Sequence, residues 1–178
     1  RRGFLKRATA GAGGFVLAST ARSYARILGA NDRIRVGLIG FADRTQDTLL
    51  PALLRYGREQ GFDVVAVSDI WRLRREQGVA AMERLTGHPC VGCRNNEELY
   101  ERKDIDAVVI ATADFQHAVH CVEAVRAGRH VYVEKPLANT MEDARAVLDA
   151  VRASGRIVQV GPQRRSGDNY IRANEYIR

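Results

Sequence analysis

The stretch Val131-Tyr132-Val133-Glu134-Lys135-Pro136 decides the fold class of this chain. Its first half is apolar and mostly β-branched, which is typical of a strand covered on both faces of a sheet. Its second half places a carboxylate and an ammonium at the carboxyl end of that strand, where open α/β sheets bind their ligands. Pro136 favours an extended backbone at Lys135 and so restricts where the ammonium can point. The stretch predicts a ligand-facing strand end, and the alternative is a strand-to-loop transition with a surface ion pair.

Predicted strands and helices alternate on both sides of this stretch. Apolar runs predict strands at 34–40, 62–68, 106–112, 130–133 and 157–160, with a short additional strand within 89–94. Apolar residues at helical spacing predict helices at 46–56, 71–85, 117–127, 140–153 and 170–177. This alternation predicts an α/β fold with a Rossmann-type doubly wound parallel sheet and right-handed crossovers.

Two of the predicted helices carry specific signals. In the helix at 140–153, apolar residues recur every three or four positions, and Gly155 suits a left-handed stop. Thr140 and Asp143 have the spacing of a capping box at its start, which makes this helix the clearest of the set. In the helix at 46–56, Pro51 is tolerable only if it falls in the first turn.

Composition and charge limit the classes of function. The chain has 178 residues, of which 46% are hydrophobic and 28% charged, and this suits one globular domain with an additional tail. Of the net charge of +7, +6 lies in residues 1–30, so the rest of the chain carries only +1. A nearly neutral domain lacks the electrostatic footprint of a nucleic-acid-binding protein, so no nucleic-acid partner is expected.

Residues 1–30 resemble a twin-arginine (Tat) export signal. Arg1-Arg2 is followed by Phe4-Leu5-Lys6 and by a weakly apolar stretch, 8–20, rich in alanine and glycine. That stretch is too short and too rich in glycine for a stable membrane span, and Ser23-Tyr24-Ala25 offers a small-x-small cleavage site. The sequence predicts export to the periplasm without stable membrane insertion, and the alternative is a disordered basic N-terminus.

The segment Gly40-Phe41-Ala42-Asp43-Arg44-Thr45 occupies the place of the dinucleotide-binding pattern G-x-G-x-x-G. Gly40 keeps the first glycine, but Ala42 puts a methyl group where the backbone approaches the pyrophosphate. Thr45 replaces the glycine that lets helix and strand pack closely. The Asp-Arg pair between them adds a negative charge beside a phosphate site and a positive charge that could offset it. Taken alone, this pattern is a weak indication of dinucleotide binding.

Asp69 ends the second predicted strand, where a carboxylate can accept hydrogen bonds from the ribose hydroxyls of NAD. It follows Gly40 by 29 residues, more than the usual spacing of about 20, and the loop at 57–61 accounts for the surplus. A carboxylate there would repel the 2′-phosphate of NADP, although Arg72 or Arg74 could pair with that phosphate. NAD is therefore favoured as the cofactor and NADP stays open. The alternative role of Asp69 is that of a helix N-cap.

Three further motifs follow one another along the chain: Ile110-Ala111-Thr112-Ala113-Asp114-Phe115-Gln116-His117, Ala127-Gly128-Arg129-His130-Val131 and Glu134-Lys135-Pro136-Leu137-Ala138. In this order they resemble the N-terminal domain of the Gfo/Idh/MocA oxidoreductases over about residues 33–165. The leader is similar to that of the family's exported branch, which includes glucose–fructose oxidoreductase. The resemblance implies a dinucleotide-binding Rossmann domain at 33–162. Residues 163–178 would begin the connection to an α+β open-sheet substrate domain that is missing from this chain.

The resemblance implies a role for each residue that matches the family pattern, first on the nucleotide side. Gly40 and Ala42 in the glycine turn would face the pyrophosphate, and Asp69 would bind the adenosine ribose. Thr112 and His117 would line the cofactor cleft beyond the fourth predicted strand. Ala42 and Thr45 depart from the family pattern, which bears on cofactor affinity and not on the fold.

The remaining roles lie on the nicotinamide side. Glu134 and Lys135 would lie at the nicotinamide, with Lys135 the catalytic residue that reaches the substrate hydroxyl. Gln163 and Arg164 match a loop that approaches the cofactor in exported members. A carboxylate beside an ammonium stabilises its charged form, so Lys135 is expected to orient and polarise the hydroxyl more than to accept its proton alone.

The implied function is that of an NAD(P)-dependent oxidoreductase that transfers a hydride between a nicotinamide cofactor and a sugar or polyol. The family supplies a further His and Asp from its second domain, and its open sheet implies a homo-oligomer at full length. One alternative is a redox-neutral, NAD-dependent glycoside hydrolase of the same fold. Another is a non-catalytic nucleotide-binding domain, which the altered glycine turn favours.

Cysteine and histidine spacing raises the question of a metal site. Cys90 and Cys93 form a single C-x-x-C pair, which suits core or loop thiols, a disulfide or, least of all, a metal site. His117 and His120 lie one turn apart on a predicted helix and could be ligands. Only Cys121 lies near them at ligand spacing, so they are expected to line the core or the cleft, and no metal site is predicted.

Overall fold

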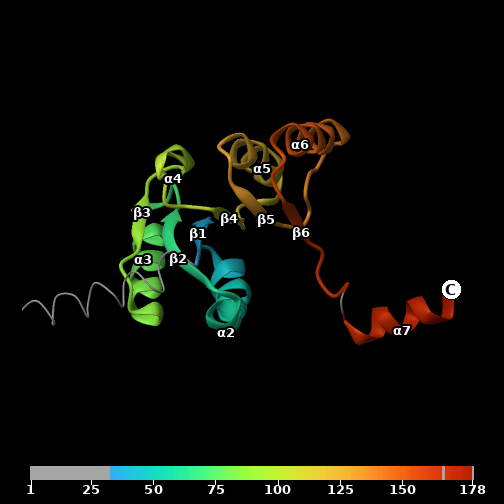
Figure 1. Cartoon of the computed structure of the whole chain (residues 1–178), viewed down its shortest axis with the longest axis horizontal. Helices are drawn as coiled ribbons and strands as arrows, with labels where there is room; N and C mark the ends of the chain where they lie inside the picture. The colour runs from blue at the N-terminus through green and yellow to red at the C-terminus, as the bar shows by residue number, and fades with distance from the viewer. Residues whose placement is uncertain (1–32, 166, 178) are drawn as a thin grey trace, which may run out of the picture. The chain divides into compact units, whose positions relative to one another are not determined.

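The computed structural model describes residues 33–165 and 167–177 and shows a single parallel sheet in that part of the chain. The strand order is β3-β2-β1-β4-β5-β6, the order of a doubly wound Rossmann sheet, as predicted. Figure 1 shows the labelled elements in the colours of the chain. The strands are β1 (Ile34–Ile39), β2 (Phe62–Ser68), β3 (Val91–Cys93), β4 (Ala107–Ile110), β5 (His130–Glu134) and β6 (Val158–Gly161).

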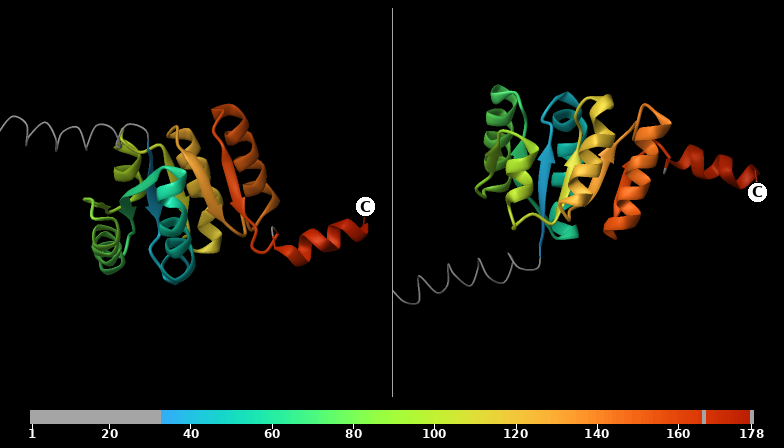
Figure 2. Two further views of the ribbon diagram at one scale, coloured as in Figure 1. Left: turned by 60° about the horizontal axis from the view of Figure 1, so that its bottom comes forward. Right: turned by 90° about the horizontal axis from the view of Figure 1, so that it is seen from above.

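Helices cover both faces of this sheet (Figures 1 and 2). The helices are α2 (Leu50–Gln60), α3 (Arg72–Thr86), α4 (Asn96–Glu101), α5 (His117–Arg126), α6 (Met141–Ser154) and α7 (Asp168–Ile177). One core cluster contains buried side chains of α4, α5 and α6. A second cluster contains those of α2 and α3. The sheet is therefore buried on both faces, which explains why its central strands are nearly continuous apolar runs.

Most of the predicted elements are confirmed, and α6 shows why its signals were clear. The Thr140 hydroxyl oxygen accepts a hydrogen bond from the backbone N–H of Asp143 at 3.1 Å, which satisfies one free donor at the helix start. The helix ends at Gly155, whose φ of 63° lies in the left-handed region. Both signals act within a few residues of the helix ends, so they could be recognised without the rest of the fold.

The residues of the helix predicted at 46–56 are all helical, but they divide between two elements. A π-helical turn (Thr45–Leu49) precedes α2, which then runs to Gln60. Pro51 falls at the first or second position of α2, where its missing N–H is tolerated. The condition placed on Pro51 is met because the π-turn restarts the helix immediately before it.

The prediction missed α4, although its start carries a recognisable cap. The Asn95 side-chain oxygen accepts a hydrogen bond from the backbone N–H of Glu98 at 2.9 Å. An asparagine three residues before a glutamate is an N-terminal signal of the capping-box type. The helix contributes Leu99, which is fully buried, and a Cβ on Gly37 of β1 would come within 2.9 Å of Leu99 Cδ1. Gly37 therefore allows α4 to pack directly on β1.

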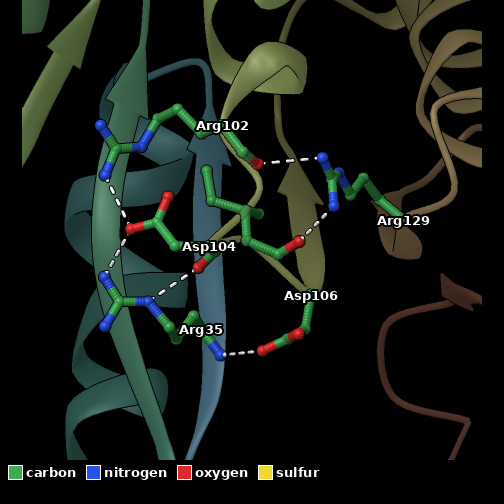
Figure 3. A network of polar contacts seen from close by, with 6 residues as sticks. Arg35, Arg102, Asp104, Asp106 and Arg129 are labelled. Carbon is green, nitrogen blue, oxygen red and sulfur yellow. Dashed lines mark hydrogen bonds and ion pairs between the residues drawn. The ribbon is translucent and has the colours of Figure 1, made fainter. Parts of the chain in front are cut away.

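A polar network joins the amino ends of β1 and β4 (Figure 3). The Arg35 guanidinium donates to the Asp104 carboxylate at 2.6 Å and to its carbonyl at 2.7 Å. Arg102 donates to the same carboxylate at 2.8 Å, and the backbone N–H of Arg35 donates to the Asp106 carboxylate at 2.8 Å. These bonds fix the register at which the two central strands begin.

Arg129 extends this network from the loop before β5 (Figure 3). Its guanidinium donates to the carbonyl groups of Ile105 at 2.6 Å, Tyr100 at 2.8 Å and Arg102 at 2.9 Å. A single arginine thus satisfies three carbonyl groups of the segment that leads from α4 into β4. It belongs to the Ala-Gly-Arg-His-Val motif, so the structure assigns part of that motif to holding the fold together.

None of the described residues of α7 is buried. Among the residues that the structure describes, no helix is long and apolar enough to cross a membrane. The predicted Tat-like leader, residues 1–30, lies outside the described residues.

Candidate nucleotide and substrate site

The glycine turn, residues 40–45, lies where the strand order reverses between β1 and β4. Gly40 has a φ of 90°, a conformation that side-chain-bearing residues rarely adopt. A Cβ on Gly40 would lie 2.7 Å from the carbonyl oxygen of Ala111 and 3.1 Å from Thr112 Cγ2. Glycine is therefore required here, because the chain crosses closely over the end of β4 at the point where open α/β sheets bind ligands.

Thr45 has a structural role in the turn where the pattern calls for glycine. Its side chain is fully buried, and its hydroxyl donates to the Gly40 carbonyl at 2.9 Å. Phe41 is only 1% exposed and packs beneath α3. A Cβ on Gly78 of α3 would come within 2.9 Å of the Phe41 ring. The close helix packing that the last glycine of the pattern usually allows therefore occurs here at Gly78 of α3. Ala42 is exposed, and its methyl group lies at the surface of the turn.

Asp69 is joined to the glycine turn by its carboxylate. One carboxylate oxygen accepts from the Phe41 backbone N–H at 2.9 Å, and the other accepts from the Trp71 backbone N–H at 2.8 Å. Trp71 is the N-cap residue of α3, so the alternative of Asp69 as the N-cap is wrong. The carboxylate is half-buried beside the turn, and each of its oxygens keeps a second lone pair for a hydroxyl donor.

The charges of the turn have partners of their own. Asp43 accepts from the Arg74 guanidinium at 3.1 Å, which offsets the negative charge that was expected to disfavour a phosphate. Arg44 does not offset the charge of Asp43, because its guanidinium pairs with Glu134. Arg74 also lies over the Trp71 ring, 5.6 Å from its centroid.

Thr112, which follows β4, has a hydroxyl oxygen that is buried and has no hydrogen-bond partner in the described part of the chain. Buried hydroxyl groups are rarely left unpaired. Its position beside Gly40 makes it a candidate donor to a phosphate or ribose oxygen. The close crossing at Gly40 and this unpaired hydroxyl fit a nucleotide at the β1–β4 junction.

His117 is placed beneath the site and not on its surface. The ring is 1% exposed, with Nδ1 2.7 Å from the carbonyl oxygen of Pro136 and Nε2 3.2 Å from that of Thr112. It therefore connects the loop after β4 with the loop after β5. The prediction that His117 lines the cleft is refined: its contacts are to the two backbone segments that carry Thr112 and Lys135.

Glu134 lies at the end of β5 in a cluster drawn from three segments. Its side chain is 4% exposed, and Oε1 accepts from Arg44 Nη2 at 2.9 Å. The Tyr132 hydroxyl lies 3.4 Å from the same oxygen. With its amide oriented to satisfy both of its atoms, Gln163 accepts from the Arg44 guanidinium at 2.8 and 3.1 Å. The glycine turn, β5 and the loop after β6 therefore meet at Arg44, whose place in this cluster the sequence did not reveal.

Lys135 lies next to this cluster but outside it. Its side chain is exposed and has no hydrogen bond or ion pair with another described residue. The bond between Lys135 and Pro136 is cis. Arg164, unlike Gln163, is not brought to the cluster; it is exposed and has a φ of 66°.

The cysteines are core thiols. Cys90 and Cys93 are both free and buried, and they belong to the two core clusters on opposite faces of the sheet. An odd spacing along an extended strand turns side chains to opposite faces, so a shared disulfide or metal ion is excluded for this pair. Burial raises the pKa of Cys90 to about 12 and that of Cys121 to about 11, which makes both thiols poor nucleophiles.

His120 takes part in a separate polar cluster at the end of β2. Its Nδ1 lies 2.9 Å from the Asn96 amide nitrogen and 3.2 Å from a Glu123 carboxylate oxygen. Ser68, buried at the end of β2, donates to Asn96 at 2.8 Å. Among the residues that the structure describes, no three His, Cys, Asp or Glu side chains are grouped to hold a metal.

Comparison with known proteins places this geometry in a family. Residues 34–162 match the family model described as "Oxidoreductase family, NAD-binding Rossmann fold", the Gfo/Idh/MocA model. An inositol 2-dehydrogenase from Saccharopolyspora erythraea is 34% identical over 148 residues, which cover 81% of this chain and 40% of that protein.

Two solved structures show the same fold with nucleotides bound. The WlbA dehydrogenase from Bordetella pertussis, in complex with NADH and UDP-GlcNAcA, matches with a TM-score of 0.71 at 26% identity, over 82% of this chain and 42% of that one. The 3-ketoreductase KijD10 from Actinomadura kijaniata, in complex with NADP, matches with a TM-score of 0.68 at 30% identity, over 82% and 44% of the two chains.

This chain spans between about a third and two fifths of the length of the curated relatives that it matches. The matched part contains the glycine turn, the junction of β1 with β4 and the end of β5, which together form the candidate site. The chain belongs to the Gfo/Idh/MocA oxidoreductase family and comprises its NAD-binding Rossmann domain.

Proposed function

We propose that the full-length protein is an NAD(P)-dependent oxidoreductase that transfers a hydride between a nicotinamide cofactor and a sugar or polyol. The observation that carries the proposal is Lys135, whose ammonium is exposed and unpaired among the described residues at the carboxyl end of β5. A relative named an inositol 2-dehydrogenase and a structural neighbour named a 3-ketoreductase support this class of substrate.

NAD is the proposed cofactor in preference to NADP. The Asp69 carboxylate lies beside the glycine turn and would accept hydrogen bonds from ribose hydroxyls, whereas it would repel a 2′-phosphate. Arg74, a candidate partner for such a phosphate, is already paired with Asp43. Exposed apolar side chains follow β2 and β4, Ile70 at 85% and Phe115 at 73%, and would suit contact with an adenine ring.

The chemistry divides between the cofactor and the protein. When bound, the nicotinamide would accept the hydrogen of the substrate carbon together with its electron pair. Lys135 would donate a hydrogen bond to the oxygen on that carbon, which holds the substrate in place and stabilises negative charge as the hydroxyl proton leaves. In the reverse direction the same ammonium would polarise the carbonyl oxygen. The proton acceptor in the forward direction would come from the substrate domain.

The experiment is nucleotide analysis of the full-length protein followed by kinetics of Lys135→Ala. Bound NAD should be released and identified by mass spectrometry, or added NAD should bind. Lys135→Ala should retain nucleotide binding but lose about 10²- to 10⁴-fold in kcat, the usual contribution of a positioned acid–base group. Lys103→Ala, at an exposed position near the amino ends of the strands, is the matched control and should keep wild-type kcat.

The outcomes separate the competing functions. Net formation of reduced nicotinamide supports the dehydrogenase, whereas release of an aglycone at a constant cofactor pool identifies the glycoside hydrolase. A protein that binds nucleotide but shows neither reaction is the non-catalytic nucleotide-binding domain, and one that neither retains nor binds nucleotide contradicts the proposed function. Full activity in Lys135→Ala overturns the assignment of the catalytic residue.

We further propose that the protein is exported through the Tat pathway, on the basis of the twin arginine and weakly apolar stretch within residues 1–30. A fusion of residues 1–30 to a reporter should reach the periplasm in a Tat-competent bacterium, and replacing Arg1 and Arg2 by lysine should stop it. Export of the lysine variant at the wild-type level, or retention of both fusions in the cytoplasm, contradicts this proposal.

A further inference from the structure

The Glu134 carboxylate is the most deeply buried charge at the candidate site. Its side chain is 4% exposed, whereas the Arg44 side chain that pairs with it is 33% exposed. The pair spans 90 positions in the sequence and is made by Nη2 of Arg44 at 2.9 Å. A buried carboxylate needs such a partner, because an unpaired charge removed from water is costly.

The other contacts of Arg44 show that this orientation is held firmly. The Gln163 amide oxygen accepts from both terminal nitrogens of the guanidinium, at 2.8 and 3.1 Å. The Nε of Arg44 is buried and has no partner in the described part of the chain, so the base of the guanidinium is also enclosed. The planar guanidinium meets two acceptors at once, which a lysine ammonium does with less geometric control.

Glu134 and Lys135 are neighbours in the sequence, yet their side chains have different surroundings. Tyr132 and Glu134 lie on one face of β5, as the 3.4 Å contact of the Tyr132 hydroxyl with Glu134 shows. Lys135 is exposed and makes no hydrogen bond or ion pair with another described residue. The carboxylate nearest to Lys135 in the sequence, that of Glu134, is therefore already paired with Arg44, which comes from another segment.

We propose that Arg44 is a positioning residue that holds the Glu134 carboxylate away from Lys135, so that the lysine ammonium stays free for the substrate oxygen. This inference rests on the proposed role of Lys135 in the reaction. Asp43, the acidic residue of the glycine turn, is paired with Arg74 and does not compete for Arg44. Without Arg44, Glu134 would be a buried carboxylate without its cation, and Lys135 is the cation nearest to it in the sequence.

The test is the acylation rate of Lys135 in the full-length protein without nucleotide or substrate. A small amine-reactive ester is used at limiting concentration, and the peptides that contain Lys135 and Lys103 are quantified by mass spectrometry. In Arg44→Gln, the acylation rate of Lys135 should fall about fivefold. This is the reduction expected when the ammonium forms a new, partly exposed ion pair. Lys103 is exposed and serves as the internal reference, so its rate should not change.

Three further variants make the result specific. Arg44→Gln combined with Glu134→Gln should restore the wild-type rate, because the carboxylate that captures Lys135 is gone. Arg74→Gln removes a guanidinium that is bound to Asp43 instead, and it should leave the rate unchanged. If Arg44→Gln does not fold, Arg44→Lys is used instead, because it keeps the positive charge. A lysine ammonium binds two acceptors with less geometric control than a guanidinium, so the acylation rate of Lys135 should fall roughly twofold.

Wild-type acylation of Lys135 in a folded Arg44→Gln protein, or in Arg44→Lys if only that variant folds, overturns the proposal. A fall that persists in the double variant also overturns it. The measurement uses no cofactor, so it is independent of the proposed function. A protein that fails to bind NAD yet shows the labelling pattern contradicts the function alone.

Discussion

His117 holds two loops in place through backbone contacts. Its two ring nitrogens face the carbonyl oxygens of Pro136 and Thr112, and the ring is almost fully buried. Removing the ring would leave a cavity and take away the N–H donor of one of these carbonyl groups. Because these carbonyls belong to the segments that carry Lys135 and the unpaired Thr112 hydroxyl, the residue bears on stability and on the position of both segments.

His117→Ala should therefore lower the free energy of unfolding by about 2–4 kcal/mol, the combined cost of a buried cavity and an unpaired carbonyl group. His117→Asn should recover part of that loss, because its amide can donate to one carbonyl. Chemical denaturation measures both. The control is His88→Ala, at an exposed position, which should change stability by less than about 0.5 kcal/mol. Equal denaturation midpoints for wild type and His117→Ala would contradict this role.

At the scale of single residues, the sequence predicted where the candidate residues lie along the strands but not which side chains they contact. Glu134 ends a strand, Gly40, Asp69, Thr112 and Lys135 come just after strand ends, and the fold brings all five to one edge of the sheet. The contact between Arg44 and Glu134 could not be predicted, because it joins residues 90 positions apart through side-chain orientation. Pattern and spacing report backbone placement and carry no information on such pairings.

At the scale of elements, the ends of a helix were predicted correctly where local sequence signals mark them. The ends of α6 were predicted because Thr140 and Gly155 act within one turn. The residues predicted as a helix at 46–56 are helical, but the π-turn before Pro51 was not predicted, because no local pattern indicates it. The short helix α4 was overlooked because it has only six residues, too few for a periodic apolar pattern. Its Asn95 cap was the available signal.

The strand β3 shows how element geometry answers a question that composition leaves open. Cys90 and Cys93 could be a disulfide or a metal pair as long as only their spacing is considered. Their placement in the two opposite core clusters follows from the alternation of side chains along an extended chain. The same reasoning was possible from the sequence once a strand within 89–94 had been predicted.

At the scale of the whole molecule, the network at the amino ends of the strands makes stability depend on pH. Burial tends to raise the pKa of the Asp104 carboxyl, but hydrogen bonds and charge from Arg35 and Arg102 outweigh it and lower that pKa. A lowered pKa means that the folded state binds the proton less readily than the unfolded state. The stabilisation is therefore present above the unfolded pKa, near 3.9, and is lost as the pH falls through the lower, folded value.

Asp104→Asn should accordingly destabilise the protein by about 1 kcal/mol at pH 7, a modest value because the side chain is 40% exposed and screened. The difference from wild type should shrink as the pH is lowered below about 4. Thermal unfolding across this pH range measures it. Asp149→Asn, on the exposed side of α6, should show no such convergence; a constant difference for Asp104→Asn would contradict the assignment.

The packing of Phe41 against Gly78 has a consequence for how chains of this kind are recognised. The close approach of helix to strand, which the third glycine of the fingerprint usually permits, is made here by a glycine 38 positions after Gly40. A search that scores six consecutive letters penalises this chain at two of three glycines, although the backbone crossing at Gly40 is intact. A pattern that paired Gly40 with a buried aromatic neighbour and a distant small residue on the second crossover helix would recover such sequences.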